Sequence, residues 1–167
     1  MIKSVIDSSE MQENKVAEFE EVDLKKAYTM ITSPAVVATK GVGVYDLTPY
    51  GWIMPMDYDP VTRVIFSSDP DHQAVANIYR EKEFAVVIPS DPKALFIEQT
   101  GSVSNPIADK FKMFSLKGEK ATKVDVLLPK DLISGWIEFK FIRSVAEGSI
   151  ELIMGEAIVA YQRVSAS

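Results

Sequence analysis

The stretch that decides the fold runs from residue 136 to residue 143 and reads Trp136-Ile137-Glu138-Phe139-Lys140-Phe141-Ile142-Arg143. Apolar and charged side chains alternate along it, which is typical of a half-buried β-strand. The turn-forming segment Ala146-Glu147-Gly148-Ser149 follows, and a second β-rich run extends from Ile150 to Tyr161, with a bend expected at Gly155. We therefore predict a long antiparallel hairpin in the last third of the chain.

Shorter β-rich runs precede this hairpin. They cover residues 35–39, 42–45, 50–56, 61–66 and 84–88. Pro55 lies inside the third run and indicates an edge strand or a bulge, because proline cannot donate a ladder hydrogen bond. Strands and helices do not alternate regularly, which argues against a doubly wound parallel sheet. We predict a mainly β fold, an antiparallel barrel with short helices at its ends.

Four helices are expected. The first starts at Asp23, where apolar residues follow at helical spacing, and must end before Pro34. The other three are expected after Asp69-Pro70, Asp91-Pro92 and Asn105-Pro106, because each pair joins an N-cap residue to a proline suited to the first helical position. Their expected apolar faces include Val75, Ile78 and Tyr79 after the first pair and Ile107, Phe111 and Phe114 after the third.

Length and composition bound the class of protein. The chain has 167 residues, which suits one domain over residues 1–167, with the acidic and polar residues 1–21 as a loosely held arm or first strand. Hydrophobic residues make up 47% and charged residues 25%, an ordinary globular balance. The net charge of −6 argues against a nucleic-acid partner. Neither a signal-peptide pattern nor a membrane-spanning apolar run is present, so we predict a cytoplasmic location and no membrane partner.

Residue counts also restrict the chemistry. There is no cysteine and only one histidine, His72, which excludes thiolate sites and makes a serine hydrolase improbable. Asp57 and Asp59 are interpreted as a solvated turn, and Gly41-Val42-Gly43 as a turn between strands, since neither continues into a calcium or dinucleotide motif. The sequence therefore predicts no metal site and no catalytic side chain.

Two polar and aromatic segments remain as candidates for binding. Residues 39–56 combine hydroxyls, Lys40, a small glycine and flat or soft apolar side chains, which would suit a planar heteroaromatic ligand. Composition alone, however, favours a core strand rich in Trp and Met. Residues 67–73 end a strand and open a helix, where free amides favour an anion. Asp69 and Asp71 would repel a phosphate there, so a capped helix without a ligand stays open as an alternative.

The order of several short motifs resembles the flavin reductase family of FMN-binding split-barrel proteins, flavoredoxins included. The matching segments are Pro34–Thr39, Asp46–Trp52, Met54–Met56, Asp59-Pro60, Asn77-Ile78, Glu83–Val86, Thr100-Gly101, Asp109–Phe111, Ile137–Phe139 and Gly155–Ala157. Together they span residues 24–161. The family commonly has asparagine at Asp46, and a lysine or arginine and then a threonine at His72 and Ala74, so this chain departs from the pattern at the expected phosphate end.

The resemblance implies an antiparallel, six-stranded-type split barrel with short peripheral helices, and a homodimer that binds FMN near the subunit interface. It implies an oxidoreductase, a flavin reductase or flavoredoxin-like electron-transfer protein that uses NAD(P)H or a redox partner protein as its electron source. A non-catalytic flavin-binding module is the alternative, and a purely structural domain is the third. The cofactor-binding residues that it implies are Thr39, Lys40, Asp46, Thr48, Pro49, Tyr50, Gly51, Trp52, Met54, Ser67, Ser68, His72, Gln73 and Asn77. Trp52 is expected either against the flavin ring or in the core, whereas Phe111 and Trp136 are expected in the core.

Overall fold

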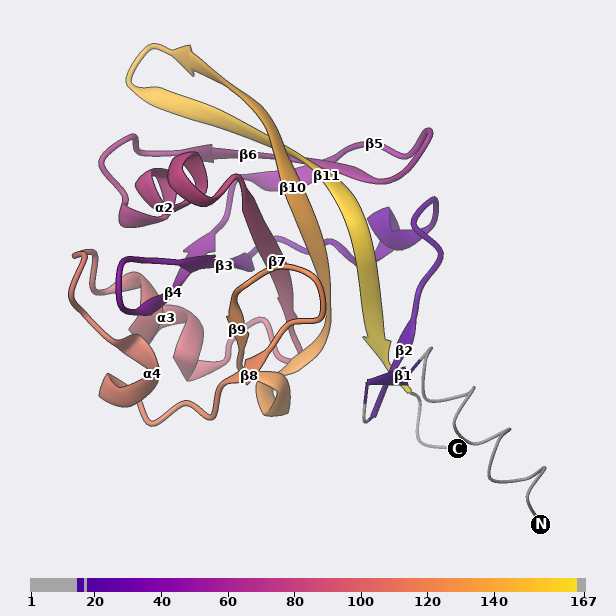
Figure 1. The fold of residues 1–167 in the computed structure, drawn as a ribbon, viewed down its shortest axis with the longest axis horizontal. Helices are drawn as coiled ribbons and strands as arrows, with labels where there is room; N and C mark the ends of the chain where they lie inside the picture. The colour runs from indigo at the N-terminus through magenta and orange to yellow at the C-terminus, as the bar shows by residue number, and fades with distance from the viewer. Residues whose placement is uncertain (1–14, 17, 165–167) are drawn as a thin grey trace.

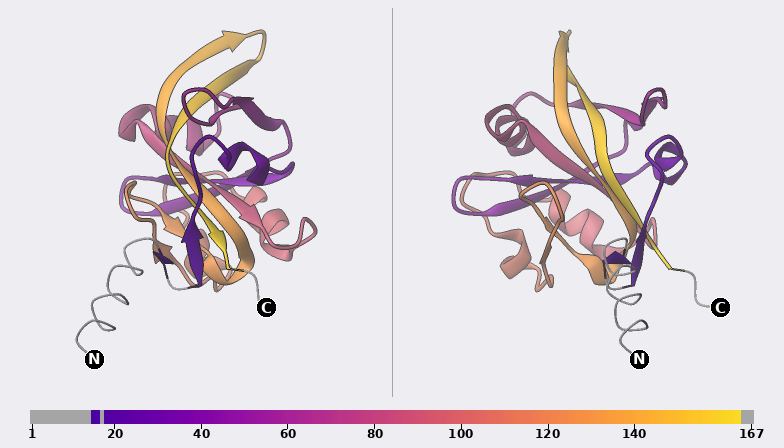
Figure 2. Two further views of the ribbon diagram at one scale, coloured as in Figure 1. Left: turned by 90° about the vertical axis from the view of Figure 1, so that its right-hand side faces the viewer. Right: turned by 45° about the vertical axis from the view of Figure 1, so that its right-hand side comes forward.

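The C-terminal hairpin dominates the structure, a computed structural model that describes residues 15–16 and 18–164. Strands β10 (Ile133–Glu147) and β11 (Ile150–Arg163) pair antiparallel along nearly their whole length, and their far end stands out from the rest of the molecule (Figures 1 and 2). The register shifts between Phe141 and Arg143, opposite Gly155 and Met154. Both the predicted hairpin and the irregularity at Gly155 are confirmed.

The other strands surround this hairpin. They are β1 (Lys15–Val16), β2 (Phe19–Glu21), β3 (Ala35–Lys40), β4 (Tyr45–Tyr50), β5 (Ile53–Asp57), β6 (Arg63–Ser68), β7 (Glu83–Pro89), β8 (Glu119–Lys120) and β9 (Leu127–Leu128). The strand predicted from residue 42 is wrong in its start, because Val42 is exposed in the turn and the strand begins at Tyr45. The run 50–56 is divided by a bend at residues 51–52.

All strand pairs in the described sheets are antiparallel. The main sheet has the order β1-β2-β11-β10-β7-β3-β4, and β6 pairs with the first half of β11 and with β5. Strand β4 therefore lies at one edge of the described sheet, and β5 and β1 lie at the other, beyond the two halves of β11. In the described sheet β5 pairs with β6 alone, and its register shifts between Pro55 and Asp57, so the edge position and the bulge predicted for Pro55 are confirmed.

The sheet buries both of its faces. One hydrophobic cluster lies between the sheet and the longest helix and includes Val64, Phe66, Ile78, Phe84, Ile137 and Phe139. The other lies on the opposite face and includes Leu47, Phe96, Phe111, Leu128, Trp136 and Tyr161. Phe111 and Trp136 are thus core residues, as expected, and strand β7 contributes alternate side chains to both clusters.

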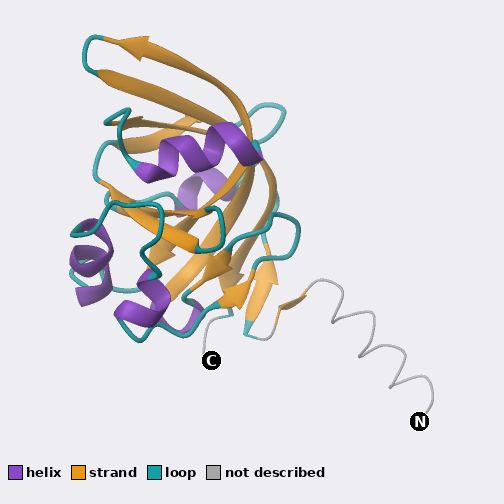
Figure 3. Ribbon diagram, turned by 60° about the vertical axis from the view of Figure 1, so that its left-hand side comes forward, coloured by secondary structure: helices purple, strands orange, loops and turns teal. Residues whose placement is uncertain are grey.

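Short helices cover the outside of the strands (Figure 3). They are α2 (Gln73–Glu81), α3 (Leu95–Gly101), α4 (Lys110–Met113) and the 3₁₀ turns η1 (Ala27–Met30) and η2 (Lys130–Leu132). Among the described residues, none of them is both long enough and apolar enough to cross a membrane.

The helix expected from Asp23 is wrong apart from the single turn η1. The Asp23 carboxylate accepts a hydrogen bond from the amide of Lys25 at 3.0 Å, so it closes a local turn. The carbonyl of Leu24 accepts a bond from Thr62 N at 2.8 Å, which ties this segment to the start of β6 instead of to a next helical turn.

The three acid- or amide-proline pairs do not start helices directly. Asp69, Asp91 and Asn105 each accept a hydrogen bond from the amide two residues later, at 2.9, 2.9 and 3.1 Å. Each pair therefore forms a turn, and the helix follows three or more residues later. Ile107, expected on a helix face, is 84% exposed, and α4 is capped by Asp109.

The N-terminal segment is only partly described. Residues 1–14 and 17, which include most of the arm expected over residues 1–21, lie outside the described residues. Strand β2 pairs with the end of β11, where Phe19 is buried edge-on against Trp136 with ring centroids 5.0 Å apart. The guanidinium of Arg163 lies over the Phe19 ring, 4.6 Å from its centroid.

Replacing Gly155 by alanine is expected to destabilise the fold by about 1–3 kcal/mol, because overpacking a filled core forces side chains off their rotamers. A Cβ at this position would lie 2.5 Å from Cζ of Phe84, whose ring is buried and stacked on Phe139. Chemical denaturation measures the loss. Gly51→Ala is the control, because nothing lies within 4 Å of its Cβ position, and an equal loss in both variants would contradict the prediction.

Candidate functional site

An apolar pocket of about 310 Å³ lies on the outer side of β5 and β6. It is lined by Gly51, Trp52, Ile53, Met54, Ile65, Phe66, Ser67 and Leu152. Trp52 is 75% exposed and Met54 is 59% exposed, so Trp52 is not a core residue. The pocket exists because β5 and β6 turn one set of side chains into the core and leave the alternate set outside.

A cluster of hydroxyl groups joins β4 to the segment that precedes α2. The Tyr50 hydroxyl lies 2.8 Å from Ser68 Oγ, and both side chains are buried. Ser68 Oγ in turn lies 3.0 Å from the carbonyl oxygen of Asp69 and 3.5 Å from Nδ1 of His72. Tyr50, Ser68 and His72, which were predicted from two separate segments, are therefore brought together.

The Tyr50 phenol is held in its neutral form. Burial, together with the nearby carboxylates of Asp46 and Asp69, raises the pKa of Tyr50 to about 12 from 10.0, against an opposing hydrogen bond from Ser68. A raised pKa means that the folded protein keeps this proton where the unfolded chain loses it. The corresponding stability is therefore fully present below pH 10 and is lost as the pH rises through 12.

Tyr50→Phe is expected to remove this alkaline dependence. Between pH 10 and pH 12 the wild type should lose about 3 kcal/mol relative to the variant, the equivalent of two pKa units. At pH 7 the variant itself should be less stable by about 1 kcal/mol, since Ser68 loses a buried partner. Urea denaturation of both proteins from pH 7 to pH 12 tests this, and parallel pH profiles would contradict it.

A second polar network lies under α2. Asn77 is fully buried and donates from Nδ2 to Thr39 Oγ1 at 3.0 Å. Its carbonyl oxygen accepts from Gln73 Nε2 at 3.0 Å and from Arg80 at 3.4 Å. Both ends of the amide thus have partners inside the protein, so Asn77 fixes the side chains of Thr39 and Gln73.

Asp46 forms a buried ion pair with Lys110. The Lys110 ammonium lies 2.8 Å from Oδ1 of Asp46 and also donates to the carbonyl of Leu47 at 2.7 Å. Both side chains are almost completely shielded from solvent. The Asp46 charge is therefore balanced within the protein and fastens α4 to the edge of β4.

Lys40, which is predicted to bind the cofactor, also has a partner within the protein. Its ammonium lies 2.8 Å from a carboxylate oxygen of Asp125, which comes from the turn between β8 and β9. The same carboxylate accepts from the Tyr45 hydroxyl at 2.7 Å and contacts Lys120. Lys40 is thus about 40% exposed but tied to a polar cluster at the far end of β3.

The predicted residues therefore fall into several groups. Gly51, Trp52, Met54 and Ser67 line the apolar pocket, and Tyr50, Ser68 and His72 form the hydroxyl cluster beside it. Thr39, Gln73 and Asn77 form the network under α2. Thr48 and Pro49 are half-buried on β4. Pro49 packs so closely against Gly101 of α3 that a Cβ added to this glycine would lie 2.9 Å from the proline ring. Asp46 and Lys40 belong to separate ion pairs.

Sequence reasoning missed several residues of these groups. Ile65 belongs to the pocket and had a signal, since it alternates with buried Phe66 and precedes Ser67 by two positions. Leu152, Lys110 and Asp125 gave no local signal. They join these groups through segments that are distant in the sequence. Leu152 lies opposite Ser67 in the pairing of β11 with β6, Lys110 binds Asp46, and Asp125 binds Lys40. Within the described part of the chain, no three acidic or histidine side chains converge as a metal site would require.

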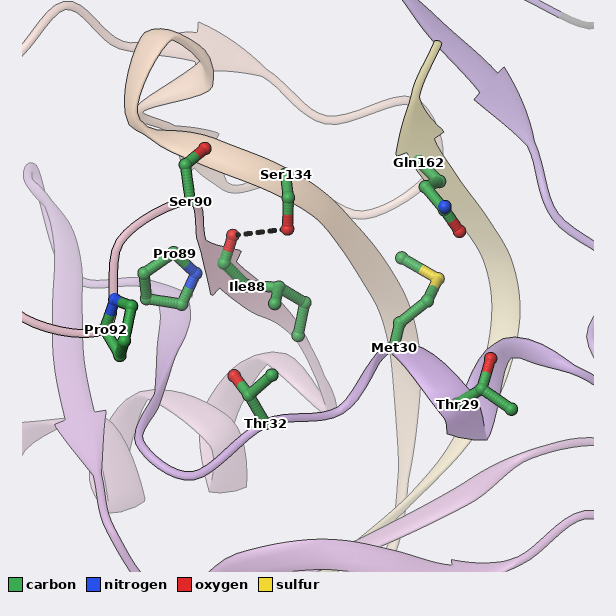
Figure 4. A pocket seen from close by; sticks show the side chains of 9 residues that line it. All are labelled: Thr29, Met30, Thr32, Ile88, Pro89, Ser90, Pro92, Ser134 and Gln162. Atoms are coloured by element: carbon green, nitrogen blue, oxygen red, sulfur yellow. Dashed lines mark hydrogen bonds between the residues drawn. The ribbon is translucent and has the colours of Figure 1, made fainter. Parts of the chain in front are cut away.

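A larger cavity of about 400 Å³ lies elsewhere, between η1 and the adjoining ends of β7, β10 and β11 (Figure 4). It is lined by Thr29, Met30, Thr32, Ile88, Pro89, Ser90, Pro92, Ser134 and Gln162. The Ser134 hydroxyl points at the carbonyl of Ile88, 3.4 Å away. None of the described residues that line it is charged, and none is a predicted site residue.

Comparison with known proteins supports the fold. The family model described as "Flavin reductase like domain" matches residues 27–166. The chain is similar to an FMN-binding domain of a flavin reductase-like enzyme from Shewanella baltica OS155, with 20% identity over 87% of this chain and 77% of that chain and a TM-score of 0.73. A flavoredoxin from Methanosarcina acetivorans has 17% identity over 78% and 69% and a TM-score of 0.69. An NADH:FAD oxidoreductase from Streptomyces globisporus C-1027 has 15% identity over 83% and 81% and a TM-score of 0.68.

These similarities confirm the mainly β split-barrel architecture. No protein in the curated collection matches the chain significantly.

Proposed function

Because the chain belongs to the flavin reductase-like domain family, we propose that it is an FMN-binding oxidoreductase. It would act as a flavin reductase or as a flavoredoxin-like electron carrier, with NAD(P)H or a partner protein as its electron source. One observation carries the proposal: Gly51, Trp52, Met54 and Ser67, four residues expected to bind the flavin, line one apolar pocket of about 310 Å³.

The chemistry of this pocket suits a flavin ring. Its volume lies at the lower end of the range for small-molecule sites, and flat or soft apolar side chains predominate over a few polar groups. Trp52 and Met54 offer such surfaces while exposed to solvent. Gly51 leaves open space at its position, because nothing lies within 4 Å of where a Cβ would be. These features support placing the ring against residues 50–54. Of the other residues expected to bind the cofactor, Thr48 and Pro49 adjoin this segment on β4, whereas Thr39 and Lys40 lie near the opposite end of the β3–β4 pair.

The phosphate end of the cofactor is proposed to lie at the start of α2. Ser67, Ser68, His72 and Gln73 surround the first turn of this helix, where backbone amides favour an anion. Ser68 and Tyr50 hold each other in place by their 2.8 Å hydrogen bond. Asp46, expected to disturb a phosphate, is instead balanced by Lys110, which removes one objection to a phosphate-bearing ligand.

This chain needs no nucleophile for the proposed reaction, since a bound flavin itself accepts and passes on the electrons. The protein supplies binding and orientation. Asn77 holds Thr39 and Gln73 by hydrogen bonds of 3.0 Å each, so these two side chains, one on β3 and one at the start of α2, are preorganised. Trp52 and Met54 would shield one side of a bound ring from water.

We further propose that residues 1–167 act as one domain, that the protein is a homodimer and that it is cytoplasmic. The dimer is proposed from the resemblance of the chain's motifs to the flavin reductase family, which implies a homodimer. Size-exclusion chromatography with light scattering tests it. A mass that stays that of a single chain at all concentrations, with and without FMN, would contradict the dimer.

The visible spectrum and fluorescence of FMN test the proposed function. Titration with the purified protein should shift the flavin absorption bands and quench the fluorescence. Trp52→Ala should weaken the effect because it removes an exposed wall of the pocket, whereas Tyr28→Ala, an exposed aromatic residue on η1, should not. An unchanged FMN spectrum at saturating protein would overturn the proposal.

A second candidate is a flavin-binding module without turnover. Two departures from the flavin reductase family favour it. His72 stands where the family commonly has a lysine or arginine, and Ala74 stands where it commonly has a threonine. Ala74 is buried and offers no polar group. Steady oxidation of NADH or NADPH by the FMN-loaded protein would exclude the module, and flavin binding without oxidation would support it.

A further inference from the structure

Met54 combines high exposure with a place in the wall of the proposed flavin pocket. Its side chain is 59% exposed on the edge strand β5, beside Trp52 and Leu152. Met113 is almost equally exposed, at 54%, but it lies on α4, which is well separated from β5 in Figure 1. The two methionines therefore share their access to solvent and differ in their distance from the pocket.

Exposure matters because the methionine thioether is readily oxidised to the sulfoxide, which turns a flexible apolar side chain into a polar one. Met30, by contrast, is nearly buried in the core. Solvent oxidants should thus attack Met54 and Met113 at similar rates and spare Met30. An oxidant released inside the pocket should attack Met54 first.

We propose that Met54 is a modification site, oxidised to methionine sulfoxide by hydrogen peroxide formed in the pocket when the protein turns over in air. This inference rests on the proposed function, which supplies the reduced flavin. Oxidation of Met54 would let the reaction weaken the binding of its own cofactor.

The chemistry balances with dioxygen as the co-reactant. Dioxygen takes two electrons and two protons, supplied from NAD(P)H and one solvent proton through the reduced flavin, and becomes hydrogen peroxide. The sulfur of Met54 then attacks one peroxide oxygen, the O–O bond breaks, an S–O bond forms and water leaves. Sulfur is oxidised by two electrons, and the peroxide is reduced by the same two.

The consequence follows from the lining of the pocket. Met54 is open to water in the free protein, but a flavin ring lying against this wall would displace that water, and the side chains of Ile53, Ile65 and Leu152 offer a sulfoxide oxygen no donor. Oxidation should therefore weaken flavin binding and slow further peroxide formation. Because methionine sulfoxide is reducible by sulfoxide reductases, the loss should be reversible.

The first test compares the two exposed methionines by peptide mass spectrometry, which detects the gain of one oxygen atom. The FMN-loaded protein is incubated with NAD(P)H in air and with catalase, which destroys peroxide that has escaped into solution. Met54 should be oxidised several-fold faster than Met113. Added hydrogen peroxide without NAD(P)H should oxidise both at similar rates.

The possible results separate this inference from the proposed function. Equal oxidation of Met54 and Met113 during turnover, with a flavin spectrum that shows binding, would overturn the inference and leave the proposed function standing. Equal oxidation with an unperturbed flavin spectrum would overturn both. Oxidation of Met54 that persists without oxygen would also overturn it, since dioxygen is the stated source of the peroxide.

Variants test the consequence without any turnover. Met54→Gln places a polar side chain of similar length in the wall and should raise the Kd for oxidised FMN several-fold, whereas Met54→Leu should keep it near the wild-type value. Met113→Gln is the matched control on α4 and should leave the Kd unchanged. An unaltered Kd in Met54→Gln would contradict the regulatory role, and far-UV circular dichroism confirms that each variant is folded.

Discussion

Replacing Glu138 by leucine is expected to lower the free energy of unfolding by about 3 kcal/mol or more, the effect of leaving several buried donors without partners. The Glu138 side chain is fully buried, and its carboxylate accepts five hydrogen bonds. They come from the amides of Thr122, Lys123 and Val124, the Thr122 hydroxyl and the Trp136 indole, at 2.6–3.0 Å. Urea denaturation followed by tryptophan fluorescence measures the loss.

Glu156→Gln is the matched control for this result. Glu156 lies on the neighbouring strand β11 and forms a surface pair with Lys140 at 3.3 Å. Surface pairs of this kind contribute about 0–1 kcal/mol, so this variant should unfold close to the wild type. A Glu138→Leu protein as stable as Glu156→Gln would show that the segment 121–126 does not depend on the buried carboxylate.

Lys110→Met is expected to cost about 3–5 kcal/mol, because it leaves the Asp46 charge buried without its counterion. Methionine keeps most of the apolar stem of lysine and removes the ammonium group, which lies 2.8 Å from Asp46. The carbonyl of Leu47 also loses its 2.7 Å donor. Thermal and urea unfolding measure the change, and Lys140→Met, at an exposed position on β10, should change stability little.

A double variant separates the ion pair from simple packing. Asp46→Asn in the Lys110→Met background removes the uncompensated charge, so the double variant should recover much of the lost stability. The two substitutions should therefore be strongly non-additive. Additive losses would show that Lys110 stabilises the fold through its stem alone and not through Asp46.

The hairpin could be predicted from the sequence because its signals are local. Alternation along residues 136–143 and the turn at 146–149 both act within a few residues, and the structure pairs these segments as expected. The same alternation gave no warning that Glu138 is buried while Lys140 is exposed. Both faces of β10 are buried at that point, and segment 121–126 covers the face that carries Glu138. Alternation of apolar and charged residues cannot reveal that a distant segment packs on the charged face.

Helix starts were less predictable, for a physical reason. Asp-Pro and Asn-Pro pairs favour an N-cap, but the same side-chain oxygens also close a turn onto the amide two residues later. At Asp69, Asp91 and Asn105 the turn is the outcome, because each chain segment must first change direction before its helix packs on the sheet.

The candidate site was predictable where it is built from neighbouring residues. Gly51, Trp52 and Met54 lie within four positions of one another, and they meet at one pocket. The pairs of Lys40 with Asp125 and of Asp46 with Lys110 join segments more than sixty residues apart. Such contacts depend on the complete sheet order, so single-sequence reasoning could not find these protein partners of Lys40 and Asp46.

The sheet order also determines when the barrel is able to close during synthesis. In the described sheet, strands β3, β4 and β7 form one half of the barrel, and β5 and β6 belong to the other. The backbone pairing that connects the two halves is supplied by β10 and β11. These two strands are synthesised after all the other described strands, and β11 also pairs with β2, the second described strand. Until then β6 and β7 present unpaired edges, which are prone to aggregation. Closure of this barrel is therefore expected to come late in folding, because it depends on pairing between segments far apart in the sequence.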